Sequence, residues 1–188
     1  MKSFLSIVLL LLAAASVWAD TKEEDAARYL ETMIQSIREE NEPMRNRMFM
    51  KLRVLGDASV GPIVDALDDP AAEVRHYLAF TLGYLDDEAV IDPLFALFRS
   101  DPDVAVRSAA AEALGRQECV EAVDPLIEAL ADTSAQLRQS AAYALGLIGD
   151  PRARPALEKA KSDSDDLVRF FAEDALVEID RAVARRKP

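Results

Sequence analysis

The sequence has few of the residues on which most catalytic and metal sites depend. Its 188 residues include one cysteine, Cys119, and one histidine, His76. A single cysteine excludes an internal disulfide, and no cysteine pair can hold a metal ion. The single histidine comes with no Ser/His/Asp spacing, no His-Glu-x-x-His sequence and no glycine-rich phosphate loop, so it indicates neither a metal site nor a catalytic triad. We therefore expect no catalytic residues, no metal and no cofactor.

Basic and aromatic residues are also scarce. The chain has 22 Lys and Arg against 34 Asp and Glu, a formal net charge of -12. Nucleic acid is not an expected partner, because phosphate binding needs clustered cations. The same charge disfavours attraction to anionic lipid. Aromatic residues make up only 6% of a chain that is 51% hydrophobic, and much of the apolar content is Ala and Leu, which favours close-packed helices. No stretch alternates as a strand would.

An almost wholly apolar run covers residues 4–17, after Lys2. Val17 and Ala19 are small or modest residues at the −3 and −1 positions of a cleavage site before Asp20. This pattern predicts a secretory signal peptide over residues 1–19, removed after Ala19. The run is short for a membrane span, which needs about 20 residues; a retained anchor is the alternative. The mature chain, residues 20–188, is expected to be periplasmic or secreted, without stable membrane insertion.

The rest of the chain repeats one unit. Four arginines are spaced 32, 31 and 31 residues apart, and each follows an aspartate by six residues. These pairs are Asp69/Arg75, Asp101/Arg107, Asp132/Arg138 and Asp163/Arg169. Leu-Gly pairs at 82–83, 114–115 and 145–146 and prolines at 62, 93, 125 and 155 recur with the same period. Such self-similarity predicts a solenoid of stacked helix pairs.

Each unit is expected to hold a short helix that begins at the proline, such as 93–99 or 125–131, and a longer second helix, such as 104–116 or 135–148. The glycine near the end of the second helix would let helices approach closely or would terminate the helix. Residues 21–40 have the apolar spacing of an amphipathic helix and are expected to cap the array. The repeats follow over about 41–184, and the first is a divergent copy in which Arg53 replaces the glycine.

The recurring V/L-R-x-x-A-x-x-A/T-L-G pattern resembles HEAT repeats, and its short, Ala- and Gly-rich form resembles the phycobilisome-lyase HEAT-like subgroup. The resemblance covers about residues 44–180. It implies an all-α, right-handed α-solenoid of about five helix pairs that serves as a protein-binding scaffold, although a minority of the family acts on bilin chromophores. It also implies that the repeated Asp and Arg residues form a ladder that links adjacent units, since an arginine fork can satisfy several acceptors at once.

Function on such a scaffold should lie where the copies differ at exposed positions. Counted from each repeated arginine, positions +3 and +7 are core, whereas +1, +5 and +9 form a variable stripe. Family members line a concave face with their second helices, so the stripe is expected to face a groove; alternatively, its aromatic rings pack between adjacent units. The predicted protein-binding residues are His76, Phe80, Tyr84, Glu112, Arg116, Gln139 and Tyr143, and the stripe also includes Met50, Val54, Phe170, Asp174 and Glu178. Replacing Phe80, Glu112 and Tyr143 together is predicted to abolish partner capture and to leave thermal stability nearly unchanged.

The function expected from these patterns is that of an exported, noncatalytic scaffold that binds another protein during assembly of an envelope complex. A rival hypothesis is a bilin-lyase-like enzyme or a chromophore or ligand chaperone, for which Cys119 is the single candidate nucleophile. That thiol could instead pair with a partner or lie unreactive between helices. A third hypothesis is a structural spacer, which predicts constitutive oligomers.

Overall fold

A computed structural model describes residues 21–185, and the predicted signal peptide lies outside these residues. The chain divides into two compact units, Met1–Ala66 and Leu67–Pro188. The described residues are helical apart from turns and loops, with no strand among them. None of the helices in residues 21–185 combines the length and apolar character of a membrane span. The predicted all-α class is confirmed.

The first unit consists of short packed helices. Residues 21–38 form a helix, followed by α2 (Glu42–Leu55), the 3-10 turn η1 (Gly56–Ser59) and α3 (Val60–Asp65). The side chain of Asn41 caps α2 by accepting a hydrogen bond from the Met44 amide at 3.1 Å. The core of this unit is formed by the buried side chains of Met33, Ile37, Leu52 and Ile63.

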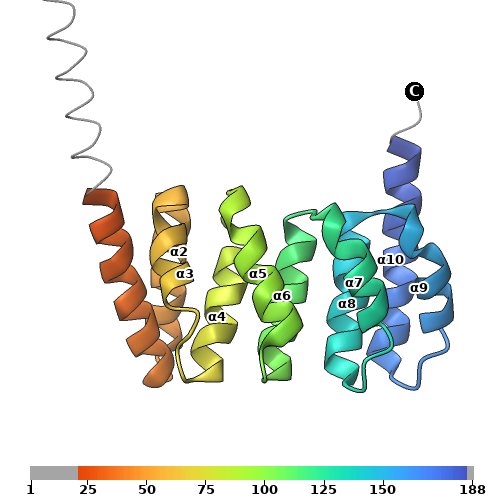
Figure 1. Ribbon diagram of the computed structural model, residues 1–188, viewed down its shortest axis with the longest axis horizontal. Coiled ribbons are helices and arrows are strands. Elements are labelled where there is room, and N and C mark those ends of the chain that lie inside the picture. Colours follow the sequence, from red (N-terminus) through yellow and green to blue (C-terminus); the bar gives the residue numbers. More distant parts are fainter. Residues whose placement is uncertain (1–20, 186–188) are drawn as a thin grey trace, which may run out of the picture. The chain divides into compact units, whose positions relative to one another are not determined.

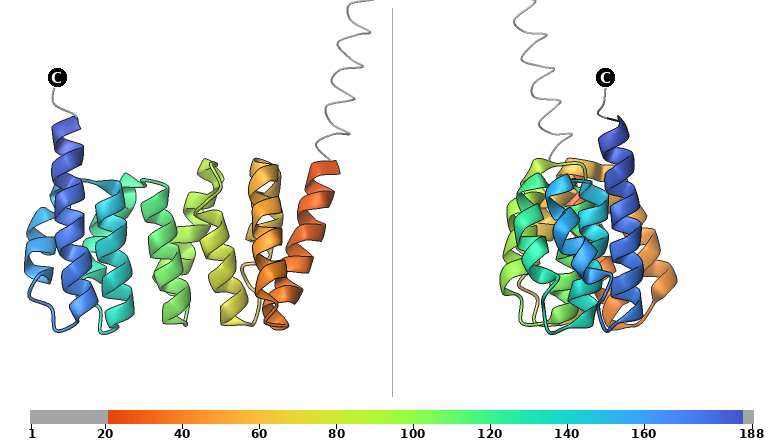
Figure 2. Two further views of the ribbon diagram at one scale, coloured as in Figure 1. Left: turned by 180° about the vertical axis from the view of Figure 1, so that it is seen from behind. Right: turned by 90° about the vertical axis from the view of Figure 1, so that its right-hand side faces the viewer.

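The second unit is a two-layer stack of helix pairs (Figures 1 and 2). The second helices of the pairs lie side by side in one layer: α4 (Ala72–Leu82), α6 (Val104–Arg116), α8 (Ala135–Ile148) and α10 (Asp166–Arg185). The first helices, α5 (Ile91–Ser100), α7 (Val123–Ala129) and α9 (Arg154–Ala160), each pack on the second helix that follows. The bounds of α6 and α8 match the predicted ranges.

The first helices begin before the prolines, not at them as predicted. Pro93 and Pro125 are the third residues of α5 and α7. Each first helix is entered through a 3-10 turn: η2 (Glu88–Val90), η3 (Val120–Ala122) and η4 (Pro151–Ala153). Asp87 and Asp150 cap two of these turns by accepting backbone hydrogen bonds at 2.8 Å. Proline is tolerated one turn later because N–H groups in the first helical turn have no intrahelical acceptor.

Glycine sets the distance between successive second helices. A Cβ atom at Gly83 would lie 2.8 Å from the Cα atom of Ala113, and one at Gly115 would lie 2.6 Å from the Cα atom of Ala144. The third repeat behaves in the same way, since a Cβ atom at Gly146 would lie 2.9 Å from the Cα atom of Ala175. Only hydrogen fits at such distances, so the glycine at position +8 is required for close helix contact.

The core lies between the two layers of helices. Positions +3 and +7 of the second helices are buried as predicted, with Leu78, Leu82, Leu114 and Leu145 fully inaccessible. Leu94, Leu126 and Leu157 supply the facing side chains from the first helices. Each fully buried leucine contributes roughly 1.5–3 kcal/mol relative to exposure.

Candidate protein-binding face

The repeated aspartates and arginines join each turn to the second helix that follows it. In the four copies, Nη1 of the arginine donates to the main-chain carbonyl of the aspartate six residues earlier, at 2.7–2.9 Å. The aspartate carboxylate accepts from the amide two residues further on, at 2.7–2.9 Å, which holds the turn. The four copies are Asp69/Arg75, Asp101/Arg107, Asp132/Arg138 and Asp163/Arg169.

Two of these arginines also reach the next repeat. Arg75 donates through Nε and Nη2 to both carboxylate oxygens of Asp101, at 2.7 and 2.9 Å. Arg138 binds Asp163 in the same bidentate way, at 2.9 and 2.8 Å. These two contacts are the links between adjacent units that the predicted ladder required.

The other two arginines differ from the predicted ladder, because their contacts stay within their own repeat. Among residues 21–185, Arg107 makes no ion pair with the aspartate of the next turn, and its guanidinium donates to two carbonyls of its own turn. Arg169 donates to the carbonyl of Asp163 and forms an ion pair with Asp166, three residues earlier in the sequence and at the start of α10. Since α10 is the last of the described helices, the described residues offer Arg169 no further turn to reach. The prediction that every repeated arginine links adjacent units is therefore wrong for Arg107 and Arg169.

The Arg75–Asp101 and Arg138–Asp163 ion pairs shift the pKa values of their members in opposite directions. Hydrogen bonds from Arg75 lower the pKa of Asp101, and those from Arg138 lower the pKa of Asp163. The same bonds raise the pKa of both guanidinium groups. Both pairs are largely buried, so each charge depends on its partner.

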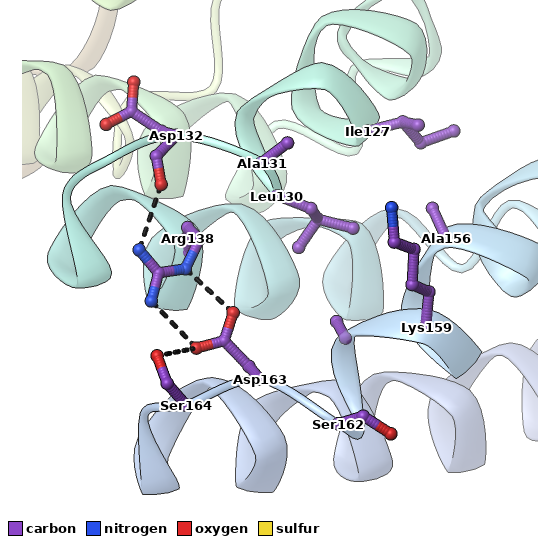
Figure 3. A pocket seen from close by; sticks show the side chains of 11 residues that line it. Ile127, Leu130, Ala131, Asp132, Arg138, Ala156, Lys159, Ser162, Asp163 and Ser164 are labelled. Atoms are coloured by element: carbon purple, nitrogen blue, oxygen red, sulfur yellow. Dashed lines mark hydrogen bonds and ion pairs between the residues drawn. The ribbon is translucent and has the colours of Figure 1, made fainter.

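A hollow of about 590 Å³ opens beside the Arg138–Asp163 pair (Figure 3). Arg138 lines it, but its Nε and Nη2 groups donate to Asp163 and its Nη1 group to the carbonyls of Asp132 and Thr133. An anion could recruit this arginine only by breaking a buried pair, at a cost of about 3–5 kcal/mol. The arrangement therefore supports a structural role for this pair and argues against a ligand site here.

Five of the predicted protein-binding residues meet in one cluster centred on Arg116. The guanidinium carbon of Arg116 lies 4.9 Å from the ring centroid of Tyr84, 5.6 Å from that of Phe80 and 5.8 Å from that of Tyr143. The Phe80 and Tyr84 rings are themselves 4.9 Å apart. One cation thus holds rings from the α4 segment and from α8, with α6 between them. Each such contact contributes about 0.5–2 kcal/mol.

Glu112 extends the cluster along α6. It pairs with Arg116 at 3.4 Å and accepts a hydrogen bond from Ser140 at 2.9 Å. Nη1 of Arg116 is buried and has no hydrogen-bond partner among the described residues. A buried N–H without an acceptor costs about 1–3 kcal/mol, which offsets part of the stabilisation from the ring contacts.

The cluster borders a groove of about 510 Å³ over α6, α8 and α10. Its lining combines charged, amide and aromatic side chains: Glu112, Arg116, Gln136, Gln139, Ser140, Tyr143, Leu167 and Phe171. The Tyr143 ring lies 5.8 Å from that of Phe171 on α10. Interfaces that bind proteins commonly present this combination of aromatic rings and arginine.

The remaining two predicted residues make contacts of their own. Gln139 lines the groove and donates to Asp165 at 2.9 Å, and this hydrogen bond is the main cause of the lowered pKa of Asp165. His76 bonds through Nδ1 to the carbonyl of Ala105 at 3.0 Å, so Nδ1 carries the proton, and its ring packs edge-on against Tyr77. Both side chains thus connect their own repeat to the next one.

The stripe predicted from the sequence is narrower than the observed face. Gln136, Ser140, Leu167 and Phe171 line the groove but lie at positions −2 and +2, outside the stripe. Residues three and four apart share a helix face, so extending the stripe by one such step would have included them. Ser108, at position +1, is buried. Phe80 and Tyr143 pack against Arg116. Replacing Phe80, Glu112 and Tyr143 together would therefore lower the thermal stability, which differs from the prediction that stability stays nearly unchanged.

The N-terminal part of the stripe lies in the first unit. Met50 and Val54 on α2 are exposed and line a hollow of about 490 Å³ with Tyr29, Arg47, Lys51 and Leu55. Lys51 lies 4.9 Å above the Tyr29 ring. This hollow combines apolar side chains with positive charge, in contrast to the acidic chain as a whole.

Cys119 lies at the entry to η3 and is buried. Burial raises the pKa of its thiol, and the hydrogen bond to the Glu121 carboxylate, at 3.5 Å, acts in the same direction. The thiolate, which is the nucleophilic form, is therefore disfavoured. No group of three or more potential metal-binding His, Cys, Asp or Glu residues occurs in the described part of the chain.

The stacked helix pairs, the arginine ion pairs between repeats and the glycine contacts define an α-solenoid. The sequence profile described as HEAT repeats matches residues 60–142 and 96–177, which together span more than half of the chain. The chain belongs to the HEAT-repeat family.

Two curated relatives illustrate how far this similarity extends. The chain is 36% identical over 92 residues to phycocyanobilin lyase subunit alpha of Picosynechococcus sp., covering 45% of this chain and 34% of that protein. It is also 36% identical over 104 residues to deoxyhypusine hydroxylase-B of Oryza sativa subsp. japonica, covering 55% of this chain and 34% of that protein. The chain thus spans about a third of the length of these curated relatives.

Solved structures show the same fold. The complex of CpcE and CpcF of phycocyanin lyase from Nostoc sp. matches with a TM-score of 0.69 and 22% identity, covering 78% of this chain and 97% of that chain. A designed armadillo repeat protein in complex with peptide (KR)4 matches with a TM-score of 0.54 and 19% identity, covering 78% of this chain and 80% of that chain. At these identities the likeness concerns the fold alone.

Proposed function

We propose that this protein is an exported, noncatalytic scaffold that binds another protein along the second-helix face of α4, α6 and α8. The observation that carries the proposal is the Arg116 cluster, in which one cation holds three aromatic rings beside a groove. The sequence pattern of residues 1–19 supports a periplasmic or secreted location. Assembly of an envelope complex is the process that we propose for such a scaffold.

The cluster has the properties expected of a binding hot spot. Tyrosine and arginine are enriched among residues that dominate interface energetics. Tyrosine offers a large contact area with only two rotatable side-chain bonds, and arginine offers a planar group with several donors. Tyr84 remains 37% exposed although it packs on Arg116 and Phe80. A partner could therefore cover rings that are already held in place, which lowers the entropy lost on binding.

The test separates binding from stability by changing Arg116 to Met. This substitution keeps an unbranched apolar stem over the rings and removes both the charge and the buried donor without a partner. We expect the melting temperature to fall modestly while the protein stays folded, because the lost cation–π contacts and Glu112 ion pair outweigh the removal of the buried donor. Capture of a partner from a crosslinked envelope extract of the native host should fall by at least about tenfold, since a hot-spot arginine contributes about 2 kcal/mol or more.

Arg99→Met is the matched control. Arg99 lies 4.9 Å above the Phe95 ring, so the same chemistry is removed from α5, in the layer of first helices. A partner that is lost with Arg116→Met and kept with Arg99→Met supports the proposal. Equal capture by both variants would show that the Arg116 cluster is not the binding face.

A bilin-lyase-like enzyme or chromophore chaperone is the second candidate. The match to phycocyanobilin lyase subunit alpha favours it, whereas burial of Cys119 and the raised pKa of its thiol oppose a nucleophilic role for that residue. Protein purified from its native host would then have a visible absorbance band that stays with the polypeptide through gel filtration. Colourless protein from a pigment-producing host would contradict this candidate.

A further inference from the structure

The helices α2 and α10 each carry exposed apolar side chains. Those on α2 are surrounded by basic residues, and those on α10 by acidic residues. On α2, Met50 is 52% and Val54 83% exposed; on α10, Phe170 is 59% and Val177 46% exposed. In each helix the two residues are separated by four or seven positions, so they share one face. Large apolar side chains exposed together commonly mark an interaction site.

The α2 surface is basic within an acidic protein. The helix has four basic residues and one acidic residue, Glu42, so its net charge is +3, against -12 for the chain. Arg47 and Lys51 are exposed and line the hollow of about 490 Å³ that Met50 and Val54 border. This surface is a hollow with apolar walls and a positive rim.

The α10 surface has the complementary character. Glu173 and Asp174 are exposed on either side of the line from Phe170 to Val177. Phe170 projects beside Phe171, with the two ring centroids 5.4 Å apart. This surface therefore presents an exposed aromatic ring, Phe170, beside two exposed carboxylates.

Another HEAT repeat in the established register cannot pack on α10. Position +8 is the glycine that follows α4 and a glycine within α6 and α8, where a Cβ atom would lie 2.6–2.9 Å from the next helix, but it is Val177 in α10. The β-branched side chain keeps any further helix at the ordinary interaxial distance of about 8–10 Å. The face therefore suits a helix that packs through side chains, as α2 would with Met50 and Val54.

We propose that α10 of one copy binds α2 of a second copy, with Phe170 in the hollow beside Met50 and the Glu173/Asp174 carboxylates against Arg47 and Lys51. Because the contact joins two different surfaces, it repeats from copy to copy and produces a ring or an open chain. The α10 surface adjoins the groove through Phe171, but none of the residues in the proposed contact belongs to the Arg116 cluster, so the inference does not depend on the proposed function. Leu167 lines the groove and is exposed beside this face, and it is left unchanged in both tests.

Sedimentation equilibrium of the purified protein over a concentration series tests the proposal through charge reversal. Wild type should show a mass that rises with concentration at about 50 mM salt and rises less at about 500 mM, because exposed charge pairs are screened. The variants Arg47→Glu/Lys51→Glu and Glu173→Lys/Asp174→Lys should each weaken association by at least tenfold. Combining all four changes restores opposite charges across the contact and should restore association.

Phe170→Ser tests the apolar part and should also weaken association by at least tenfold. Val120→Ser is its matched control, because Val120 is 50% exposed on η3, outside both surfaces. All changed side chains are exposed, so the far-UV melting curves should match that of wild type. A protein that stays monomeric at every concentration overturns the proposal. So does association that survives either charge reversal, or a fourfold variant that remains monomeric.

Discussion

Substitution of the glycine at position +8 tests how closely successive second helices must pack. Gly115→Ala is the most informative substitution, because the added Cβ atom would make the shortest contact. A Cβ atom at Gly115 would lie 2.6 Å from the Cα atom, 2.8 Å from the Cβ atom and 3.1 Å from the carbonyl oxygen of Ala144. These are largely backbone atoms of α8, so no flexible side chain can move aside. Relief of the clash requires α6 and α8 to separate along their contact.

The magnitude follows from two opposing effects. Alanine is more favourable than glycine in a helix interior by about 1 kcal/mol. Overpacking a well-packed core costs typically about 1–3 kcal/mol, and the backbone contact at Gly115 places it near the upper end. We expect Gly115→Ala to lower the free energy of unfolding by about 2 kcal/mol, measured by urea denaturation followed by circular dichroism.

Gly61→Ala is the matched control. Gly61 lies in α3, its φ angle is not in the left-handed region, and no atom lies within 4 Å of the position of its Cβ atom. Only the helix propensity changes there, so the free energy of unfolding should rise by about 0.5–1 kcal/mol. If Gly115→Ala proves as stable as wild type, or more stable, the close contact between successive second helices is not required for packing.

The remaining predictions concern the inter-repeat ion pairs and the lone thiol. The pKa of Asp163 is lowered in the folded protein, so its contribution to stability is fully present above the unfolded-state pKa of about 3.9 and is lost as pH falls through the folded value. Asp163→Asn should therefore lower the free energy of unfolding by about 2 kcal/mol at pH 7 and by less at pH 3. The control Asp124→Asn changes an exposed carboxylate and should leave the free energy of unfolding unchanged at either pH. Equal losses for Asp163→Asn at pH 7 and pH 3 would contradict this reasoning. The Cys119 thiol should react with a disulfide reagent at pH 8 at least about tenfold more slowly in the folded protein than in urea, because burial disfavours the thiolate. Equal reaction rates in the folded protein and in urea would support Cys119 as a candidate nucleophile.

Features within one repeat were predictable from the sequence. The period of about 31 residues is visible directly as recurring residues, and the bounds of α6 and α8 and the burial of positions +3 and +7 depend on spacings along a single helix. Such patterns report which residues share a helix face, because the helical period is fixed by the backbone. The arginine contact with the carbonyl of its own turn, six residues away, also recurs in every copy.

Contacts between repeats were decided only by the tertiary structure. All four arginines occupy the same position of the repeat, yet two reach the aspartate of the next turn, whereas Arg107 and Arg169 do not. The sequence placed Phe80, Arg116 and Tyr143 in one stripe, but their packing into a single cluster depends on how far each helix is rotated and separated from the next. An ion pair or a ring contact is made or lost over about 1 Å, and no pattern along the chain specifies the distance between two helices that finely.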